Sequence, residues 1–166
     1  MPWWVWLVPL VGILVFLWRR QAKPRYHVHI SFGQLNHFAE QFVRAQKAGS
    51  VMLVEREKTA GLIQVKLKNV EENDVTVEIG MPEVDWSTDE FDRIEATLSD
   101  TGFVTRVGGG RGCSNVRRFL RASASGDENT AVASVIRGIG VVGASLGWET
   151  ASFTVHYEVS WRSRVE

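Results

Sequence analysis

The stretch PWWVWLVPLVGILVFLW, residues 2–18, contains no charged side chain and is followed directly by Arg19 and Arg20. As an α-helix it would be roughly 25 Å long, close to the hydrocarbon thickness of a bilayer, about 30 Å. A signal peptide begins with basic residues and ends in small ones, whereas this stretch begins with Pro-Trp-Trp and ends in Trp-Arg-Arg. The sequence therefore predicts a retained single-pass transmembrane helix over residues 1–20, rather than a signal peptide or a buried core helix.

The residues around this helix predict its orientation. Four basic residues, Arg19, Arg20, Lys23 and Arg25, follow the helix before any acidic residue. The positive-inside rule therefore places the N-terminus outside and the rest of the chain in the cytoplasm. The expected location is the inner membrane of a bacterial-type cell. Tryptophans near both ends are expected at the interfaces, a proline should kink the helix and a glycine should allow close packing. The residues expected to position the anchor are Trp3, Trp4, Trp6, Pro9, Gly12, Trp18, Arg19 and Arg20. Because the span has no ionisable side chain, we expect it to anchor and pack without doing chemistry.

The remainder of the chain is long enough for one domain. A short basic linker, residues 21–25, precedes residues 26–166, which we expect to fold as a single cytoplasmic unit. The formal net charge of zero gives no general affinity for nucleic acid, and none is expected as a partner. Cys113 is the only cysteine, so an intrachain disulfide is excluded and a free thiol is expected.

Hydrophobic periodicity predicts an α+β domain. Alternating apolar residues predict strands over 26–30, 51–55, 62–68, 75–79, 103–107, 116–122 and 153–161. Capping boxes at residues 31–34 and 87–90 introduce two helices that end near Gly49 and Gly102, and a third covers residues 131–146 before Gly147. The predicted order is β-α-β-β-β-α-β-β-α-β, which favours a mostly antiparallel sheet with about three helices packed on it.

Without its flanking strands, this order resembles that of the secretion-chaperone-like fold, α-β-β-β-α-β-β-α. The resemblance covers roughly residues 31–147 and lies in the order of the elements, not in a residue motif. It therefore implies a fold and no function.

One glycine pattern matches a cofactor motif by spacing alone. Residues 138–143 have the G-x-G-x-x-G spacing of dinucleotide-binding loops, and Glu158 lies where a ribose-binding acid would be expected. The motif needs a preceding strand and further βα units, which this sequence lacks, so no cofactor is expected. We expect instead that small residues on this helix let another backbone approach closely, either the sheet or a partner subunit. These residues are Gly140, Gly143, Ala144 and Gly147.

Charge is segregated along the domain. Residues 71–100 carry many acids and one base, Arg93, whereas residues 101–125 carry five arginines and no acid. The two segments could pair with each other or form separate docking faces. Glycines 108–110 and 112 could also hold a phosphate through backbone N–H groups, or simply form a hairpin tip. The candidate contacts for a partner or an anion are Arg106, Arg111, Arg117, Arg118 and Arg121.

The remaining reactive side chains form no recognisable site. His27 and His29 share one face of their predicted strand, and His156 lies on the polar face of the last one, but the sequence does not bring a third ligand to them. Arginines near Cys113 could lower the pKa of its thiol, yet no motif supplies a base. We therefore expect no metal site and no catalytic residue.

These observations favour a non-catalytic accessory, structural or assembly subunit of a larger membrane complex of the energy-transducing, secretion or envelope type. Its expected partners are integral membrane protein subunits and the lipid bilayer, without a small-molecule ligand. The alternative is a membrane-surface module that binds anionic lipid or a phosphate compound through residues 108–121.

Overall fold

The computed structural model describes residues 29–57, 61–71, 73–109 and 115–158. The predicted anchor and linker, together with His27, Arg111 and Cys113, lie outside these residues. Within the part of the chain that the structure describes, no helix has the length and apolar character needed to span a bilayer.

The described residues form an α+β domain whose elements follow the predicted order, with a short 3-10 turn added before the first helix. In chain order they are β1 (His29–Ser31), η2 (Phe32–Gln34), α2 (Leu35–Ala45), β2 (Val51–Arg56), β3 (Leu62–Glu71), β4 (Asp74–Pro82), α3 (Thr88–Asp100), β5 (Val104–Gly109), β6 (Arg118–Gly126), α4 (Glu128–Ser145) and β7 (Ser152–Glu158).

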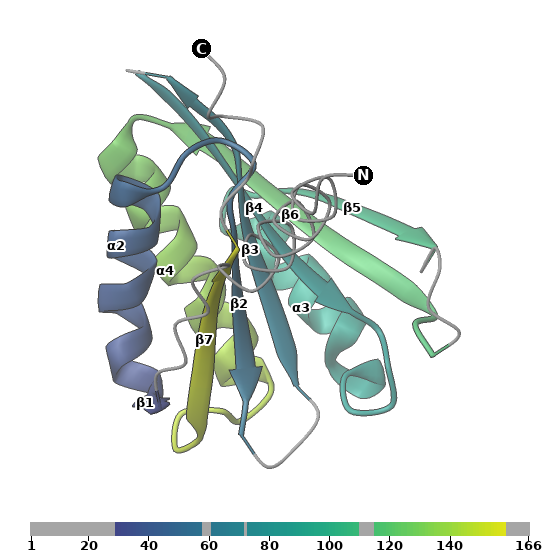
Figure 1. Ribbon diagram of the computed structural model, residues 1–166. Helices are drawn as coiled ribbons and strands as arrows, with labels where there is room; N and C mark the ends of the chain where they lie inside the picture. The colour runs from purple at the N-terminus through teal and green to yellow at the C-terminus, as the bar shows by residue number, and fades with distance from the viewer. Residues whose placement is uncertain (1–28, 58–60, 72, 110–114, 159–166) are drawn as a thin grey trace, which may run out of the picture.

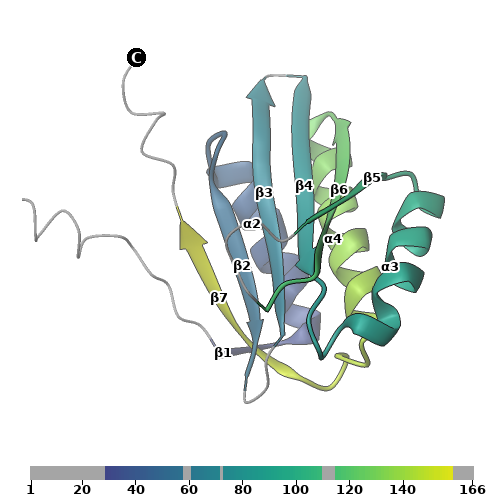
Figure 2. The same cartoon turned by 90° about the vertical axis from the view of Figure 1, so that its right-hand side faces the viewer.

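The strands form one seven-stranded sheet in the order β1-β7-β2-β3-β4-β6-β5, and every neighbouring pair is antiparallel (Figure 1). The C-terminal strand β7 lies between β1 and β2, so the two ends of the described domain meet at one edge of the sheet. Helices α2, α4 and α3 lie side by side against one face of the sheet, as Figure 2 shows. The prediction of a mostly antiparallel sheet with about three helices is confirmed.

Strand alternation separates the two faces of the sheet. In β3, Ile63, Val65 and Leu67 are buried toward the helices, whereas Gln64 and Lys66 lie on the opposite face and are only partly covered. The same alternation continues through β2, β4, β6 and β7. We call the side opposite the helices the open face, because no described helix covers it. Its side chains include Leu53, Leu62, Gln64, Lys66, Glu78, Phe119, Arg121 and His156.

Two helices end in Schellman motifs, as their glycines predicted. After α3, Gly102 has a φ of 94°, and the N–H of Phe103 donates to the carbonyl of Leu98 at 3.1 Å. After α4, Gly147 has a φ of 64°, and the N–H of Trp148 donates to the carbonyl of Gly143 at 2.8 Å. The second turn directs the Trp148 side chain into the core.

Three local predictions need correction. The strand expected to end at residue 122 continues to Gly126, because β6 pairs with β4 from Pro82 to Val75. Residues 123–126 therefore belong to the sheet. Helix α2, expected to end near Gly49, ends at Ala45 because the backbone of Gln46 is extended. Helix α4 then begins at Glu128, three residues earlier than predicted, and the side chain of Asp127 caps it by accepting from the N–H of Thr130.

The two predicted capping boxes have different outcomes. At the first, the side-chain oxygen of Gln34 accepts from the backbone N–H of Ser31 at 2.9 Å, so the expected return contact is present. At the second, Ser87 is the N-cap residue of α3, but its hydroxyl does not cap the helix. It turns inward, accepting from the N–H of Val84 at 3.0 Å and donating to the carbonyl of Pro82 at 2.8 Å.

Candidate functional site

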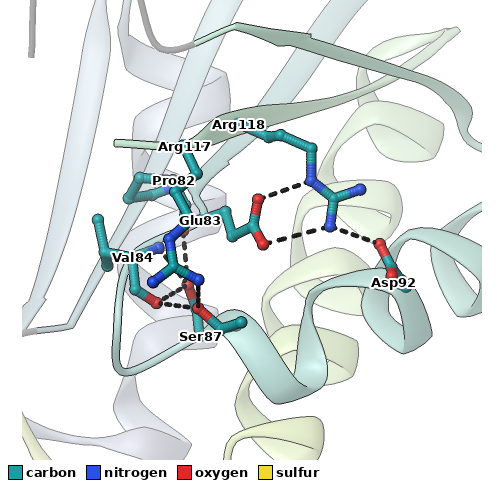
Figure 3. Close-up of polar contacts among 8 residues, drawn as sticks. Pro82, Glu83, Val84, Ser87, Asp92, Arg117 and Arg118 are labelled. Carbon is teal, nitrogen blue, oxygen red and sulfur yellow. Dashed lines mark hydrogen bonds and ion pairs between the residues drawn. The ribbon is translucent and has the colours of Figure 1, made fainter. Parts of the chain in front are cut away.

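Three of the five candidate arginines pair with acids inside the domain. The guanidinium of Arg118 binds the Glu83 carboxylate in a two-point contact, with Nε 2.6 Å from Oε2 and Nη2 3.2 Å from Oε1 (Figure 3). Nη2 also lies 2.9 Å from Oδ1 of Asp92 on α3, and the guanidinium stacks over the ring of Phe91. The end of β6 is thereby joined to the loop after β4 and to α3.

This contact changes the ionisation of both partners. The Arg118 guanidinium, by donating hydrogen bonds, holds the pKa of the buried Glu83 carboxyl below its ordinary value. The hydrogen bonds from Glu83 and Asp92 raise the pKa of Arg118, which stays charged throughout the accessible pH range. A carboxylate bound in this way is a structural anion, because its lone pairs are already directed at a fixed cation.

Arg117 joins the same contact region from the adjacent backbone position. Its N–H donates to the carbonyl of Glu83 at 3.0 Å, and its Nη2 lies 3.6 Å from the exposed Asp85 carboxylate. The acidic and basic segments therefore pair with each other at Arg117 and Arg118, which was one of the two arrangements left open by the sequence. Both side chains are engaged with this loop and with α3, so they are poorly placed to bind a separate anion.

Arg121 and Arg106 lie elsewhere, on the open face. Arg121 on β6 is directly opposite Arg106 on the edge strand β5, and Lys66 and Lys68 approach the same region from β3. Glu78 on β4 lies among them, with a carboxylate oxygen 3.1 Å from Nζ of Lys68 and another 4.0 Å from Nε of Arg121. These side chains, with Thr76, Val104 and Ser123, line a depression of about 480 Å³ that we call the basic end of the groove.

The groove continues along the strands into an apolar end of about 700 Å³. Leu62, Pro82, Val116 and Phe119 line it together with Gln64 and three glycines, and it shares Glu78 and Arg121 with the basic end. Its floor is shaped by Gly80, where an added Cβ would lie 2.8 Å from Cε1 of Phe119. The Phe119 ring lies over this glycine, and the Arg121 guanidinium is 5.4 Å from the ring centroid.

Sequence reasoning found Arg106 and Arg121 but missed Lys66 and Lys68. The alternation of residues 62–68 did predict that both lysines face away from the core. The sequence did not indicate the strand order. In the sheet only β4 lies between β3 and β6, so the two lysines lie near Arg121. The sequence also did not indicate the register shift between Leu67 and Asn69, where Lys68 is the extra residue without a cross-strand partner on β4.

The small residues predicted for close packing on α4 have separate roles. A Cβ on Gly143 would lie 2.2 Å from two ring carbons of Phe32, so this glycine does permit close approach. Gly140 has no neighbouring atom within 4 Å of the same position, Ala144 is exposed, and Gly147 forms the helix C-terminus. The tightest contact belongs to Gly138, where a Cβ would lie 1.9 Å from Cδ1 of Ile79.

Of the three described histidines, two contact one carboxylate each, and His37 contacts the side-chain amide of Gln41 at 2.9 Å. His29 forms an ion pair with Glu57, and Nε2 of His156 lies 3.2 Å from Oε2 of Glu55. Within residues 29–57, 61–71, 73–109 and 115–158, no group of three His, Cys, Asp or Glu side chains could hold a metal ion.

Comparisons with protein-family models, with curated proteins and with solved structures give no match for this chain.

Proposed function

We propose that this chain is a non-catalytic, single-pass accessory or assembly subunit of a larger membrane complex, which contacts a partner subunit through the open face of its sheet. The observation that carries the proposal is the asymmetry of the domain. Three helices cover one face of the sheet, and no described helix covers the other. A wide sheet face with both apolar and charged side chains is suited to contact with another protein.

The half of the open face formed by β2 and β7 supports this role. Leu53 lies between the polar side chains of His156 and Gln64 on the two neighbouring strands. Glu55 and Thr154 occupy the next positions on the same face. An apolar centre with a polar rim is the usual anatomy of a protein interface. Combined with the predicted anchor, it favours the cytoplasmic part of an integral membrane protein as the partner.

Site-specific photo-crosslinking in native membranes tests the proposal. A photoreactive amino acid at Leu53 or Thr154 is expected to give a crosslinked product with an integral membrane protein. The matched positions are Asn36 on α2 and Ala133 on α4, which are exposed on the helical side and are expected to give none.

Extraction of the full chain in mild detergent provides a second measurement. Co-purification of the crosslinked protein in constant proportion supports a stable complex. A monomer without any co-purifying integral membrane protein would contradict the proposal, as would equal crosslinking from both sides of the domain.

A further inference from the structure

We propose that the groove on the open face, between β3 and β5, binds an anionic amphiphile: a lipid whose phosphate-bearing head group lies at the basic end and whose chain begins at the apolar end. This site does not depend on the docking role: it adjoins the Leu53 region at Gln64, but neither Leu53 nor Thr154 lines it.

The basic end has more cations than its own carboxylate satisfies. Lys66, Lys68, Arg106 and Arg121 line it, and Glu78 is the one acidic side chain among its lining residues. Among the described residues, the side chains of Lys66 and Arg106 form no ion pair or hydrogen bond, whereas Glu78 engages Lys68 and, at longer distance, Arg121. The surplus positive charge favours an anion.

The position of the two arginines strengthens this inference. Arg106 and Arg121 are direct cross-strand partners on one face, and like charges in that position repel. An anion between them would remove the repulsion and accept hydrogen bonds from both guanidinium groups. Thr76 and Ser123 bring hydroxyl groups to the same depression, and a phosphate oxygen can accept from either of them.

The apolar end identifies the ligand as more than a free anion. Leu62, Pro82, Val116 and Phe119 would leave apolar surface exposed beside a small phosphate, and covering that surface is favourable. Gly80 is required for this shape, because any side chain there would displace the Phe119 ring.

The spacing of the two ends fits a lipid. Phe119 and Ser123 are both on β6, four residues apart, which corresponds to roughly 13 Å along an antiparallel strand. This length is enough for a glycerophosphate group followed by the first methylene groups of an acyl chain. Since Glu78 and Arg121 line both ends, head group and chain would occupy one continuous groove.

The test uses the full chain in a non-ionic detergent, with binding measured by native mass spectrometry over a ligand titration. Dioctanoyl phosphatidylglycerol supplies an anionic head and chains, dioctanoyl phosphatidylcholine supplies the chains without net charge, and inorganic phosphate supplies the anion alone. We expect the anionic lipid to bind at least about tenfold more tightly than either of the other probes, which each engage one end of the groove.

Matched variants distinguish binding in the groove from nonspecific attraction of an anionic lipid to positive charge elsewhere on the domain. The double variant Arg106→Ala, Arg121→Ala should weaken binding of phosphatidylglycerol by about thirtyfold, since each cation near an anionic head group contributes several-fold. The control, Arg93→Ala with Arg137→Ala, removes the same charge from the helical side and should leave binding unchanged. Leu62→Asn should weaken binding of the lipid but not of phosphate.

The outcomes are distinct. Equal affinity for the two lipids, or an equal loss in both double variants, would overturn the site. Equal affinity for phosphate and phosphatidylglycerol would overturn the amphiphile as its ligand. Thermal unfolding of each variant identifies any loss that comes from misfolding, and the Leu62→Asn variant, which retains all four cations, keeps the test decisive if the arginine variant unfolds. Crosslinking from Leu53 tests the docking role separately and can succeed or fail without affecting these results.

Discussion

At the scale of single residues, Glu83 shows how a charge can be used for architecture. Its carboxylate is buried, accepts two hydrogen bonds from Arg118, and belongs to a segment whose N–H and C=O groups pair with the backbone of residues 117 and 118. The sequence predicted Arg118 as a candidate contact for a partner or an anion and left open whether the acidic segment pairs with it, because Glu83 and Asp92 are far from it in the chain. Folding brings them together, and the arginine is then satisfied inside the domain.

The first prediction concerns the Glu83→Gln variant, which retains the shape of the side chain and removes its charge. We expect a loss of about 1–3 kcal/mol in the free energy of unfolding at pH 7, since a charge-assisted two-point contact is replaced by a neutral one. Thermal unfolding measures this loss. The exposed Glu149→Gln is the matched control and should change little.

The same pair gives a pH dependence with a defined sign. Because the pKa of Glu83 is lower in the folded than in the unfolded protein, its contribution is fully present above the unfolded value, about 4.3 for glutamate, and is lost as pH falls through the folded value. The stability difference between the native chain and Glu83→Gln should therefore shrink as the pH is lowered from 5 toward 3. A difference that stays constant over this interval would contradict the assigned pKa shift.

At the scale of elements, α4 illustrates what a glycine pattern in a sequence leaves undetermined. Helical spacing singled out Gly140 and Gly143 equally, but spacing does not show which side of the helix meets the sheet. In the structure Gly138 and Gly143 face neighbours, and Gly140 does not. Selecting the packed glycines requires knowledge of the helix rotation, which is a property of the tertiary contacts.

A pair of alanine substitutions in α4 tests this assignment. Gly140→Ala should stabilise the domain by up to about 1 kcal/mol, because the site is open and alanine favours the helix. Gly138→Ala should destabilise it by about 1–3 kcal/mol, because the buried Ile79 and Phe103 side chains must both move. Chemical denaturation of the two variants measures the difference. Equal effects, or a stabilised Gly138→Ala, would show that α4 packs differently.

Periodicity predicted the order of the elements because it is a local property. Alternation in residues 62–68 and the spacing of Phe91, Ile94 and Leu98 each depend on a few neighbouring residues, and both predictions were correct. The extension of β6 was missed because Ser123, Ala124, Ser125 and Gly126 have little intrinsic preference for a strand. Pairing with Val75 to Glu78 on β4 keeps them extended.

At the scale of the whole molecule, the candidate site depends on strand order, and strand order is not local. The groove takes side chains from β3, β4, β6 and β5, which are neighbours in the sheet although α3 separates β4 from β5 in sequence. Two of its four cations were predicted as candidates, and the two lysines were recognised only as solvent-facing. Turn residues indicate pairing only between strands that follow one another in the chain, and the pairing of β4 with β6 across α3 leaves no such local signal.

The proposals for the open face also depend on where the domain lies relative to the membrane. The cations after residue 18 predict that residues 26–166 remain in the cytoplasm, since positively charged flanks are retained on that side. The groove would then be exposed to the cytoplasmic leaflet, whose anionic lipids are the ligand class it fits. An opposite orientation would remove that source of ligand.

The single cysteine makes this orientation measurable in the native chain. In intact spheroplasts, a membrane-impermeant maleimide should not label Cys113, and it should label this thiol once SDS has dissolved the membrane and unfolded the domain. In the reciprocal variant, Cys113→Ser with Pro2→Cys, the label should react in intact spheroplasts, because the short N-terminus is predicted to face out. Labelling of Cys113 before the membrane is disrupted would reverse the predicted topology and separate the groove from the cytoplasmic leaflet. Protection of both positions in intact spheroplasts would place the whole chain inside and contradict residues 2–18 as a span.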